Sequence, residues 1–213
     1  MTGEPKVRNG WLDPALRREF EGLGLHYTVV ERGSGRSGRE LKNRLRDLSN
    51  RFSGPQAINL RHQPIVWAYR VFFRHIGLDP DEQPTPVEEL AIERMRSGGF
   101  RSRSVLDDAL TIAMIESHVA LRALDADRVA DAPGIRPTQP GEGLEGRPGE
   151  LPPGTLVIAD AERPLGLLFG ATASGRGVQP KTKRTMLVAV RVKGVPDIAV
   201  EEALWLATGV MQG

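Results

Sequence analysis

The sequence of 213 residues contains no cysteine. It therefore has no disulfide framework, no thiolate nucleophile and no metal site with cysteine ligands. It also has no apolar run approaching the roughly 18 residues that a membrane-spanning helix needs. The N-terminal residues, MTGEPKVRNG, lack a hydrophobic segment after their first charges, which argues against a secretory signal. These absences predict a cytoplasmic protein without membrane contact.

Motifs of several enzyme classes are also missing. There is no G-x-S-x-G elbow and no GK[ST] loop, so neither a hydrolase of that fold nor a P-loop nucleotidase is indicated. Asp125 and Asp127 have the spacing of a metal-binding pair, but two carboxylates at a strand end more often form a turn. None of the four histidines has metal-ligand spacing: His26, His62, His75 and His118. We expect no metal and no cofactor, and assign no catalytic residue.

Basic residues are unevenly distributed along the chain, whose net charge is +2. Residues 1–103 carry 18 Lys and Arg against 13 Asp and Glu, whereas the remainder carries 11 against 14. Two basic clusters are candidates for contact with RNA phosphates: the turn with Lys181, Lys183 and Arg184, and the helix with Lys42 and Arg46. For the turn, a solvated turn before an alternating strand is the alternative interpretation.

The segment GSGRSG, residues 33–38, matches the G-x-G-x-x-G pattern between a predicted strand and a predicted helix. Its backbone N–H groups are suited to a phosphate at the helix N-terminus. Two residues separate the strand from the first glycine, however, and no series of parallel strands follows, as a dinucleotide fold requires. A flexible surface turn and an anion site both remain open.

Hydrophobic periodicity predicts helices over residues 13–24, 39–52, 64–77, 86–97, 104–118 and 196–211. β-Branched and alternating segments predict strands over residues 25–31, 119–127, 155–160, 164–170 and 185–192. Residues 133–154 are rich in glycine and proline and predict turns with short edge strands. We expect helix 64–77 at the centre of the core, strand 185–192 to alternate, and Asp197 to cap the last helix.

The junction between helices 64–77 and 86–97 is specified by several residues. Gly77 permits a left-handed stop, and Pro80 and Pro84 keep the connector extended. Thr85 and Glu88 form a capping box that restarts the helix. The junction is therefore interpreted as architectural. Helices come first, strands next and a helix last, which predicts an α+β fold. We expect an N-terminal extension over residues 1–59 and a main domain over residues 60–213.

Three segments in one order resemble a known family: AYRVFFRHIGLDPDEQPTPVEEL, SVLDDALTIAMIESHVALRALDAD and LVIADAERPLGLLFGATASGRGVQPKTKRTMLVAV. Together, over roughly residues 60–210, they resemble the editing domain of the phenylalanyl-tRNA synthetase beta subunit and its free-standing relatives. That domain is formed by the subunit's third and fourth modules. The resemblance implies an α+β unit with a β-sandwich-like layer, and an activity that hydrolyses tyrosine mischarged on phenylalanine tRNA.

The resemblance also implies a ligand pocket formed by Leu110, Thr111, Arg122, Gly170, Ala171, Thr182 and Val188. Arg122 stands where the family has a histidine, and Val188 where it has a glutamate. Leu110 and Thr111 replace a threonine and an asparagine. Valine offers no partner for a tyrosine hydroxyl, and arginine cannot act as a base.

Two hypotheses follow for the function. The first is a stand-alone domain that binds tRNA or aminoacyl-tRNA, with editing hydrolysis left open. The second is a module for a small anionic or amino-acid-like ligand, in which Arg122 holds a carboxylate by a two-point contact. A continuous positive surface leading into the pocket would favour the first, and an isolated arginine in a closed cavity the second.

Overall fold

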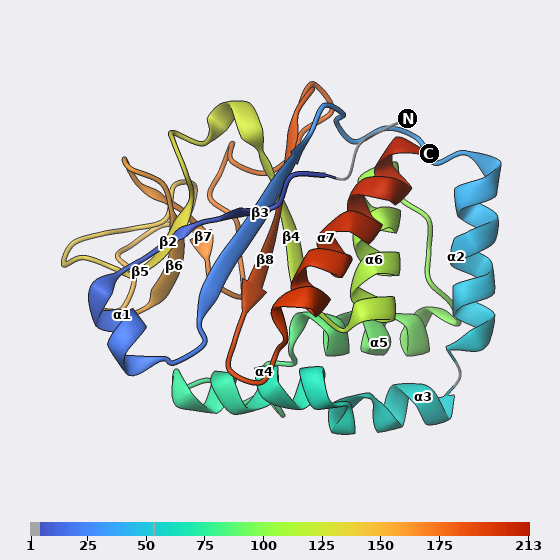
Figure 1. Cartoon of the computed structure of the whole chain (residues 1–213), viewed down its shortest axis with the longest axis horizontal. Helices are drawn as coiled ribbons and strands as arrows, with labels where there is room; N and C mark the ends of the chain where they lie inside the picture. The colour runs from blue at the N-terminus through green and yellow to red at the C-terminus, as the bar shows by residue number, and fades with distance from the viewer. Residues whose placement is uncertain (1–4, 53) are drawn as a thin grey trace.

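The structure is a computed structural model that describes residues 5–52 and 54–213. The first four residues of the segment used to argue against a secretory signal lie outside this range. The molecule is layered: one sheet lies in the middle, a second sheet on one side of it, and the long helices on the other side (Figure 1). Helices and strands occur largely in separate runs along the chain, which confirms the predicted α+β class.

The first sheet has the strand order β1-β3-β8-β4, with every neighbouring pair antiparallel. The second sheet has the order β2-β5-β6-β7, in which β2 and β5 are parallel and the other pairs antiparallel. The strands are β1 (Arg8–Asn9), β2 (Trp11–Leu12), β3 (Gly24–Val30), β4 (Leu121–Asp125), β5 (Gly134–Pro137), β6 (Leu156–Ala159), β7 (Pro164–Leu167) and β8 (Thr185–Arg191).

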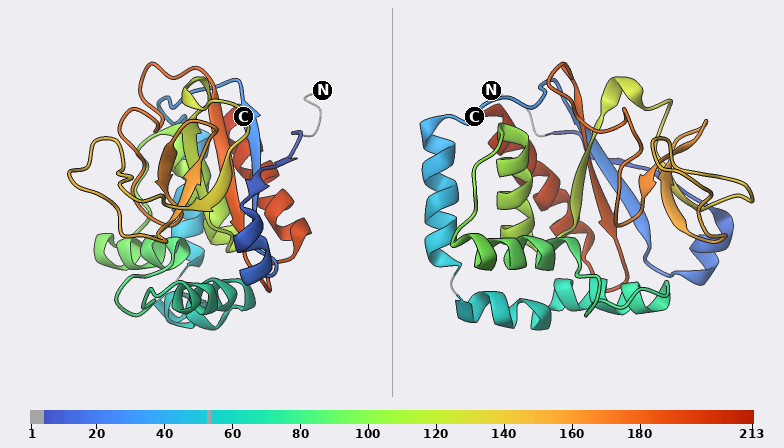
Figure 2. Two further views of the ribbon diagram at one scale, coloured as in Figure 1. Left: turned by 90° about the vertical axis from the view of Figure 1, so that its left-hand side faces the viewer. Right: turned by 180° about the vertical axis from the view of Figure 1, so that it is seen from behind.

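Strand β8 is one of the two inner strands of the first sheet, and six of its seven residues are buried. The sequence prediction that it alternates between a buried and an exposed face is therefore wrong. Helices cover one face of β8 and the second sheet covers the other (Figure 2). The side chains on both faces of the strand are therefore buried. Each fully buried Val or Leu of this kind stabilises the fold by roughly 1.5–3 kcal/mol.

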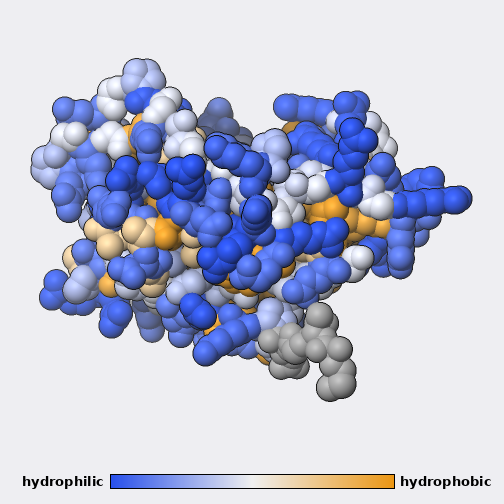
Figure 3. Space-filling model, turned by 90° about the horizontal axis from the view of Figure 1, so that it is seen from above, coloured by the Kyte–Doolittle hydropathy of each residue, from blue (hydrophilic) through white to orange (hydrophobic). Residues whose placement is uncertain are grey.

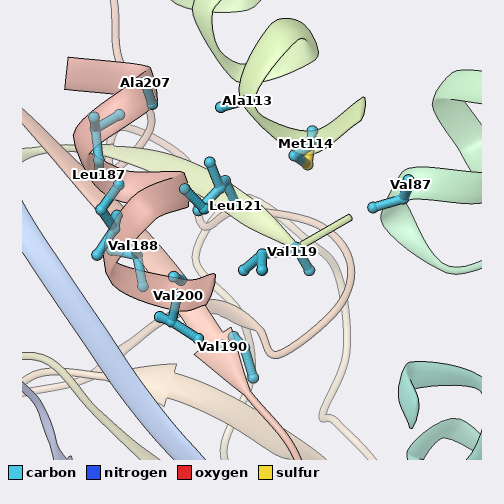
Figure 4. Packing of buried hydrophobic residues seen from close by; sticks show 14 of the residues in the cluster. Val87, Ala113, Met114, Val119, Leu121, Leu187, Val188, Val190, Val200 and Ala207 are labelled. Carbon is cyan, nitrogen blue, oxygen red and sulfur yellow. The ribbon is translucent and has the colours of Figure 1, made fainter. Parts of the chain in front are cut away.

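Helices α6 and α7 pack against each other and cover the first sheet, and α2 lies outside α6 (Figure 1). Leu187 of β8 lies between the strand and α7, close to Ala207, as Figure 4 shows. The helices are α1 (Pro14–Glu19), α2 (Arg39–Arg51), α3 (Gly54–Asn59), α4 (Pro64–His75), α5 (Pro86–Ser97), α6 (Val105–Ser117) and α7 (Asp197–Gln212), with short 3-10 turns η1 (Leu60–His62) and η2 (Ala126–Arg128). Among the described residues, no helix is long and apolar enough to cross a membrane.

Helix α4 runs along one end of the sheet, and the expectation that it lies at the centre of the core is wrong. Only one face is buried, while Trp67 on the other face is 49% exposed. The buried face is fixed by Tyr69, whose hydroxyl donates to the carbonyl oxygen of Val190 at 2.5 Å and accepts from the N–H of Ala120 at 3.2 Å. One phenol therefore joins α4 to β8 and to the entry of β4.

The junction between α4 and α5 is organised by a buried arginine. Arg70 is 4% exposed and donates to the carboxylates of Asp81 and Glu88, at 2.5 and 2.7 Å. The Glu88 carboxylate also accepts from the N–H and hydroxyl of Thr85, which confirms the capping box. Gly77 has φ +80°, a conformation that glycine adopts without strain.

Two predicted helix ends need correction. Helix α7 has Pro196 at its N-cap, and Asp197 does not cap it. The Asp197 carboxylate instead accepts a hydrogen bond from the Arg191 guanidinium. Helix α1 ends at Glu19, with Phe20 at its C-cap, and does not extend to residue 24 as predicted. Gly22 lies in the following turn with φ +80°.

The GSGRSG segment is anchored, so its interpretation as a flexible turn is wrong. The hydroxyl of Ser37 donates to the buried carboxylate of Asp108 at 2.6 Å, and the carbonyl of Gly35 accepts from the N–H of Val105 at 2.8 Å. A Cβ at Gly33 would lie 1.8 Å from the carbonyl oxygen of Thr182. Gly33 is therefore required by the close approach of two backbone segments, and this requirement does not involve a bound phosphate.

The N-terminal residues contribute strands to both sheets. β1 and β3 belong to the first sheet, and β2 pairs with β5 in the second. The expected extension over residues 1–59 is thus joined to the remainder by strand pairing as well as by packing. A division of the chain at residue 59 stays a prediction.

Candidate functional site

Arg122 and Val188 stand directly opposite each other where β4 pairs with β8. Paired residues of antiparallel strands project from the same face, and residues two positions along share it. Ala120 and Val190 therefore lie on the same face as Arg122 and Val188. The family resemblance predicted that Arg122 and Val188 belong to one pocket. The strand register brings these two residues together.

The Arg122 guanidinium is held by two carbonyl oxygens, one at the end of β7 and one in the loop after it. It donates to the oxygen of Leu167 at 2.5 Å and to that of Gly170. No carboxylate of the described residues forms an ion pair with it, although such pairs are found for many other arginines of the chain. Burial lowers the pKa of Arg122 to about 10, so the side chain stays protonated at neutral pH. The result is a fixed cation without a counter-ion.

A cavity of about 460 Å³ lies against this face of the sheet. Its floor is apolar and includes Val188 and Val190 of β8, which Figure 4 labels. Phe73 and Phe169 close one side with ring centroids 4.9 Å apart. A volume of this size suits a small ligand or the end of a larger one.

The wall opposite the sheet comes from the α4–α5 junction. Pro84, Pro86, Glu89 and Glu93 line the cavity there. Sequence reasoning interpreted this junction as purely architectural and missed its carboxylates. The sequence did contain a signal for them. A capping box after an extended connector holds the side chains at the start of the helix in defined positions. The Arg70 network therefore shapes one wall of the candidate site.

Leu110 and Thr111 do not line this cavity. They line a neighbouring hollow of about 140 Å³, which shares Leu90, Glu93 and Met114 with it. They lie on α6, and Met114 of the same helix lines both hollows. Of the seven predicted pocket residues, Arg122, Gly170 and Val188 line the cavity of about 460 Å³.

Thr182 and Ala171 lie elsewhere. The Thr182 hydroxyl donates to the Asp125 carboxylate at 2.6 Å and accepts from the N–H of Gln179 at 3.0 Å. The second oxygen of Asp125 accepts from the N–H of Asp127 at 3.1 Å, which supports the turn interpretation of these aspartates. Thr182 is thus a buried turn residue. Ala171 is exposed on the loop after β7 and does not line the cavity.

The basic turn before β8 is divided in its charges. Lys181 and Lys183 are exposed, and no ion pair to a described residue involves either of them. Arg184, in contrast, is paired with Glu31 at 3.0 Å and Asp127 at 2.8 Å. On α2, Lys42 and Arg46 are exposed, and Arg46 donates to the amide oxygen of Asn43 at 2.8 Å. The face seen from above in Figure 3 is largely hydrophilic, with apolar residues in separate patches.

Comparison with known proteins places this arrangement in a class. The sequence model of the B3/4 domain family matches residues 68–199, which is more than half of the chain. The matched range contains α5, α6, β4, the second sheet's later strands and β8, and so the whole lining of the cavity. The chain belongs to the B3/4 domain family and is a tRNA-synthetase-related domain.

Individual relatives agree with this assignment. The chain is similar to the phenylalanine–tRNA ligase beta subunit of Hahella chejuensis, with 36% identity over 107 residues, covering 49% of this chain and 13% of that protein. It is 34% identical over 102 residues to the same subunit of Pasteurella multocida, covering 46% and 13%. It is 36% identical over 94 residues to that of Xanthomonas campestris, covering 43% and 12%. The matched part is about an eighth of each relative.

Proposed function

We propose that this chain binds tRNA at its aminoacylated end, with the aminoacyl group in the cavity beside Arg122. The observation that carries the proposal is the pairing of a fixed cation with an apolar floor in a cavity of about 460 Å³. The floor suits an apolar side chain, and the guanidinium suits the carbonyl oxygen of the ester that joins the amino acid to the ribose. The similar proteins from Hahella chejuensis and Pasteurella multocida are beta subunits of phenylalanine–tRNA ligase.

RNA contact is proposed at the turn before β8. Thr185 pairs with Asp125 at the end of the β4–β8 ladder, three positions from the Arg122–Val188 pair. At about 3.3 Å a residue, the turn lies roughly 10 Å along the strands from that pair. Lys181 and Lys183 are free to neutralise phosphates, whereas Arg184 is already paired with two carboxylates. Lys42 and Arg46 on α2 form a second basic surface. Such a partner implies a cytoplasmic protein.

The aminoacyl part of the proposal is tested by comparing an aminoacylated acceptor stem with the same stem uncharged. The charged form is expected to bind about tenfold more tightly, and Arg122→Met to remove this difference while leaving the uncharged stem unaffected. Arg176→Met is the matched control, because Arg176 also donates to a backbone carbonyl, that of Arg128 at 2.7 Å, and does not line the cavity. Equal binding of the two stems by the wild-type protein would refute the proposal.

The phosphate contacts are tested by the salt dependence of stem binding. Lys181→Gln with Lys183→Gln should weaken binding and flatten the salt dependence by about two charge units. Arg184→Gln should change the slope less, because Glu31 and Asp127 already offset its charge. An unchanged slope in the double variant would remove this turn from the interface.

A second candidate is a free small carboxylate as ligand, held by Arg122. The absence of an ion-pair partner for Arg122 among the described residues favours it, because a buried cation gains most from an anionic ligand. In a thermal unfolding experiment, 3-phenylpropionate should then stabilise the wild-type protein and not Arg122→Met. A stabilisation of equal size in both proteins would exclude this candidate.

A further inference from the structure

We propose that Glu89 is a specificity-determining residue that binds the ammonium group of the ligand, so that the cavity selects an apolar amino acid with a free amine. This inference rests on the proposed function and names the substrate class of the same cavity. It commits the site to two polar contacts, Arg122 on the sheet for a carbonyl oxygen and Glu89 on the α4–α5 wall for an ammonium, with the side chain of the amino acid on the apolar floor.

The three glutamates of α5 are in different situations. Glu88 is buried and accepts hydrogen bonds from Thr85 and Arg70. Glu93 lines the cavity, but its carboxylate is bonded to the Arg103 guanidinium. Glu89 lines the cavity and has no side-chain hydrogen bond or ion pair to any described residue. Glu89 is therefore the carboxylate of this wall that is available to a ligand.

Glu89 is also held in a defined position. It lies in the first turns of α5, where its N–H donates to the carbonyl of Thr85 at 2.9 Å. The capping box and the Arg70–Glu88 ion pair fix that turn against α4. Because the backbone of Glu89 is fixed in this way, only its side-chain rotamers have to be ordered when the ligand arrives.

The charges of the cavity fit an aminoacyl ester better than a free acid alone. An aminoacyl ester carries one positive charge, on its amine, and its carbonyl oxygen is a neutral acceptor. The ammonium is attracted by Glu89, and the carbonyl accepts from Arg122. Partial burial raises the pKa of the Glu89 carboxyl, and no neighbouring cation offsets this effect. An ammonium beside it would supply the missing positive charge.

The test uses neutral-carbonyl analogues of an aminoacyl group. Phenylalaninamide and leucinamide carry the amine, and 3-phenylpropanamide and 4-methylpentanamide are the same molecules without it. Binding to the full-length protein is measured by calorimetry or by ligand-observed NMR. We expect one or both amines to bind about tenfold more tightly than their deaminated counterparts, and Glu89→Gln to remove the difference.

Glu82→Gln is the matched control, because Glu82 is an exposed carboxylate of the same junction that does not line the cavity. It should bind all four compounds as the wild type does. If the amines and the deaminated amides bind equally well, or if Glu89→Gln keeps the preference, the role of Glu89 is wrong while binding in the cavity stands. If none of the four compounds binds, both this inference and the proposed function fail.

Discussion

At the scale of single residues, Val188 and Arg122 decide what chemistry the cavity can support. Val188 is fully buried and offers no hydrogen bond to a tyrosine hydroxyl. Arg122 is a permanent cation at neutral pH that donates to two backbone carbonyls and has further N–H groups for a ligand. A site of this kind can bind and orient a carbonyl, but neither side chain can take a proton from water.

We therefore predict that the protein does not hydrolyse phenylalanine tRNA mischarged with tyrosine at a rate comparable with a synthetase editing domain. The missing polar partner leaves the tyrosine hydroxyl unpaired, which disfavours its binding by about 1–3 kcal/mol. The measurement is deacylation of purified mischarged tRNA, with a synthetase containing its editing domain as the positive control. Rapid hydrolysis by the wild-type protein would contradict the prediction and point to backbone groups as the source of activity.

A second residue-scale prediction concerns Thr85. Its N–H and hydroxyl both donate to the Glu88 carboxylate, at 3.1 and 2.8 Å. Thr85→Ala should lower the free energy of unfolding by about 1 kcal/mol through loss of the cap. Denaturant titration measures it. Thr155→Ala, at an exposed threonine hydroxyl bonded to Pro152, is the comparison, and a cost no larger than in that variant would mean that the cap contributes little.

At the scale of elements, the α4–α5 junction links stability to the shape of the cavity. Arg70 joins α4 to Asp81 in the connector and to Glu88 in α5, and the same turn presents Pro84, Pro86 and Glu89 to the cavity. A disturbance of the ion pairs is thus transmitted to one wall of the site. Ligand binding and the stability of this junction are coupled through the same few residues.

Arg70→Met is predicted to destabilise the protein by about 3–5 kcal/mol, because it leaves the Glu88 carboxylate buried with less compensation. The double variant Arg70→Met with Glu88→Gln should recover part of that loss, since no uncompensated charge remains. Both are measured by chemical denaturation. Arg74→Met, which removes an exposed partner of Asp81, should change stability by less than about 1 kcal/mol. Failure of the double variant to recover any stability would contradict the ion-pair explanation.

At the scale of the whole molecule, acid should weaken the fold through its histidines. Burial lowers the pKa of His26, with the Arg191 charge as a second cause, and burial alone lowers that of His118. Both groups bind a proton less readily when folded than when unfolded. Their contribution to stability is present above the unfolded pKa of 6.5 and is lost as pH falls through the lower folded values.

The prediction is a decrease in the free energy of unfolding between about pH 6.5 and pH 5, before most carboxylates titrate. His118→Asn should reduce the decrease, and asparagine tolerates the left-handed backbone that His118 adopts, with φ 62°. Urea titrations at several pH values measure both. His75→Asn, at an exposed histidine, is the control, and an equal effect of the two substitutions would contradict the burial argument.

The sequence predicted the elements better than their arrangement. Periodicity located helices such as α5 and α6 because their caps, Thr85 and Ser104, are local signals. It did not reveal that β3 pairs with β8, because strand pairing between distant segments leaves no local pattern. Only part of the site was predicted, because its residues also come from segments that are distant in the sequence. Arg122 and Val188 meet through register, whereas Glu89 became a cavity residue only through the tertiary position of the junction.

The pairing of β3 with β8 also orders the events of folding. Every rung of this ladder joins residues more than 150 positions apart, from Val30 with Thr185 to Gly24 with Arg191. During synthesis on the ribosome, β3 emerges early, and the edge that pairs with β8 stays unpaired until β8 has been synthesised. Contacts between such distant segments slow folding, because a long loop must close first. The first sheet is therefore completed late, and until then β3 is exposed to pairing with other chains.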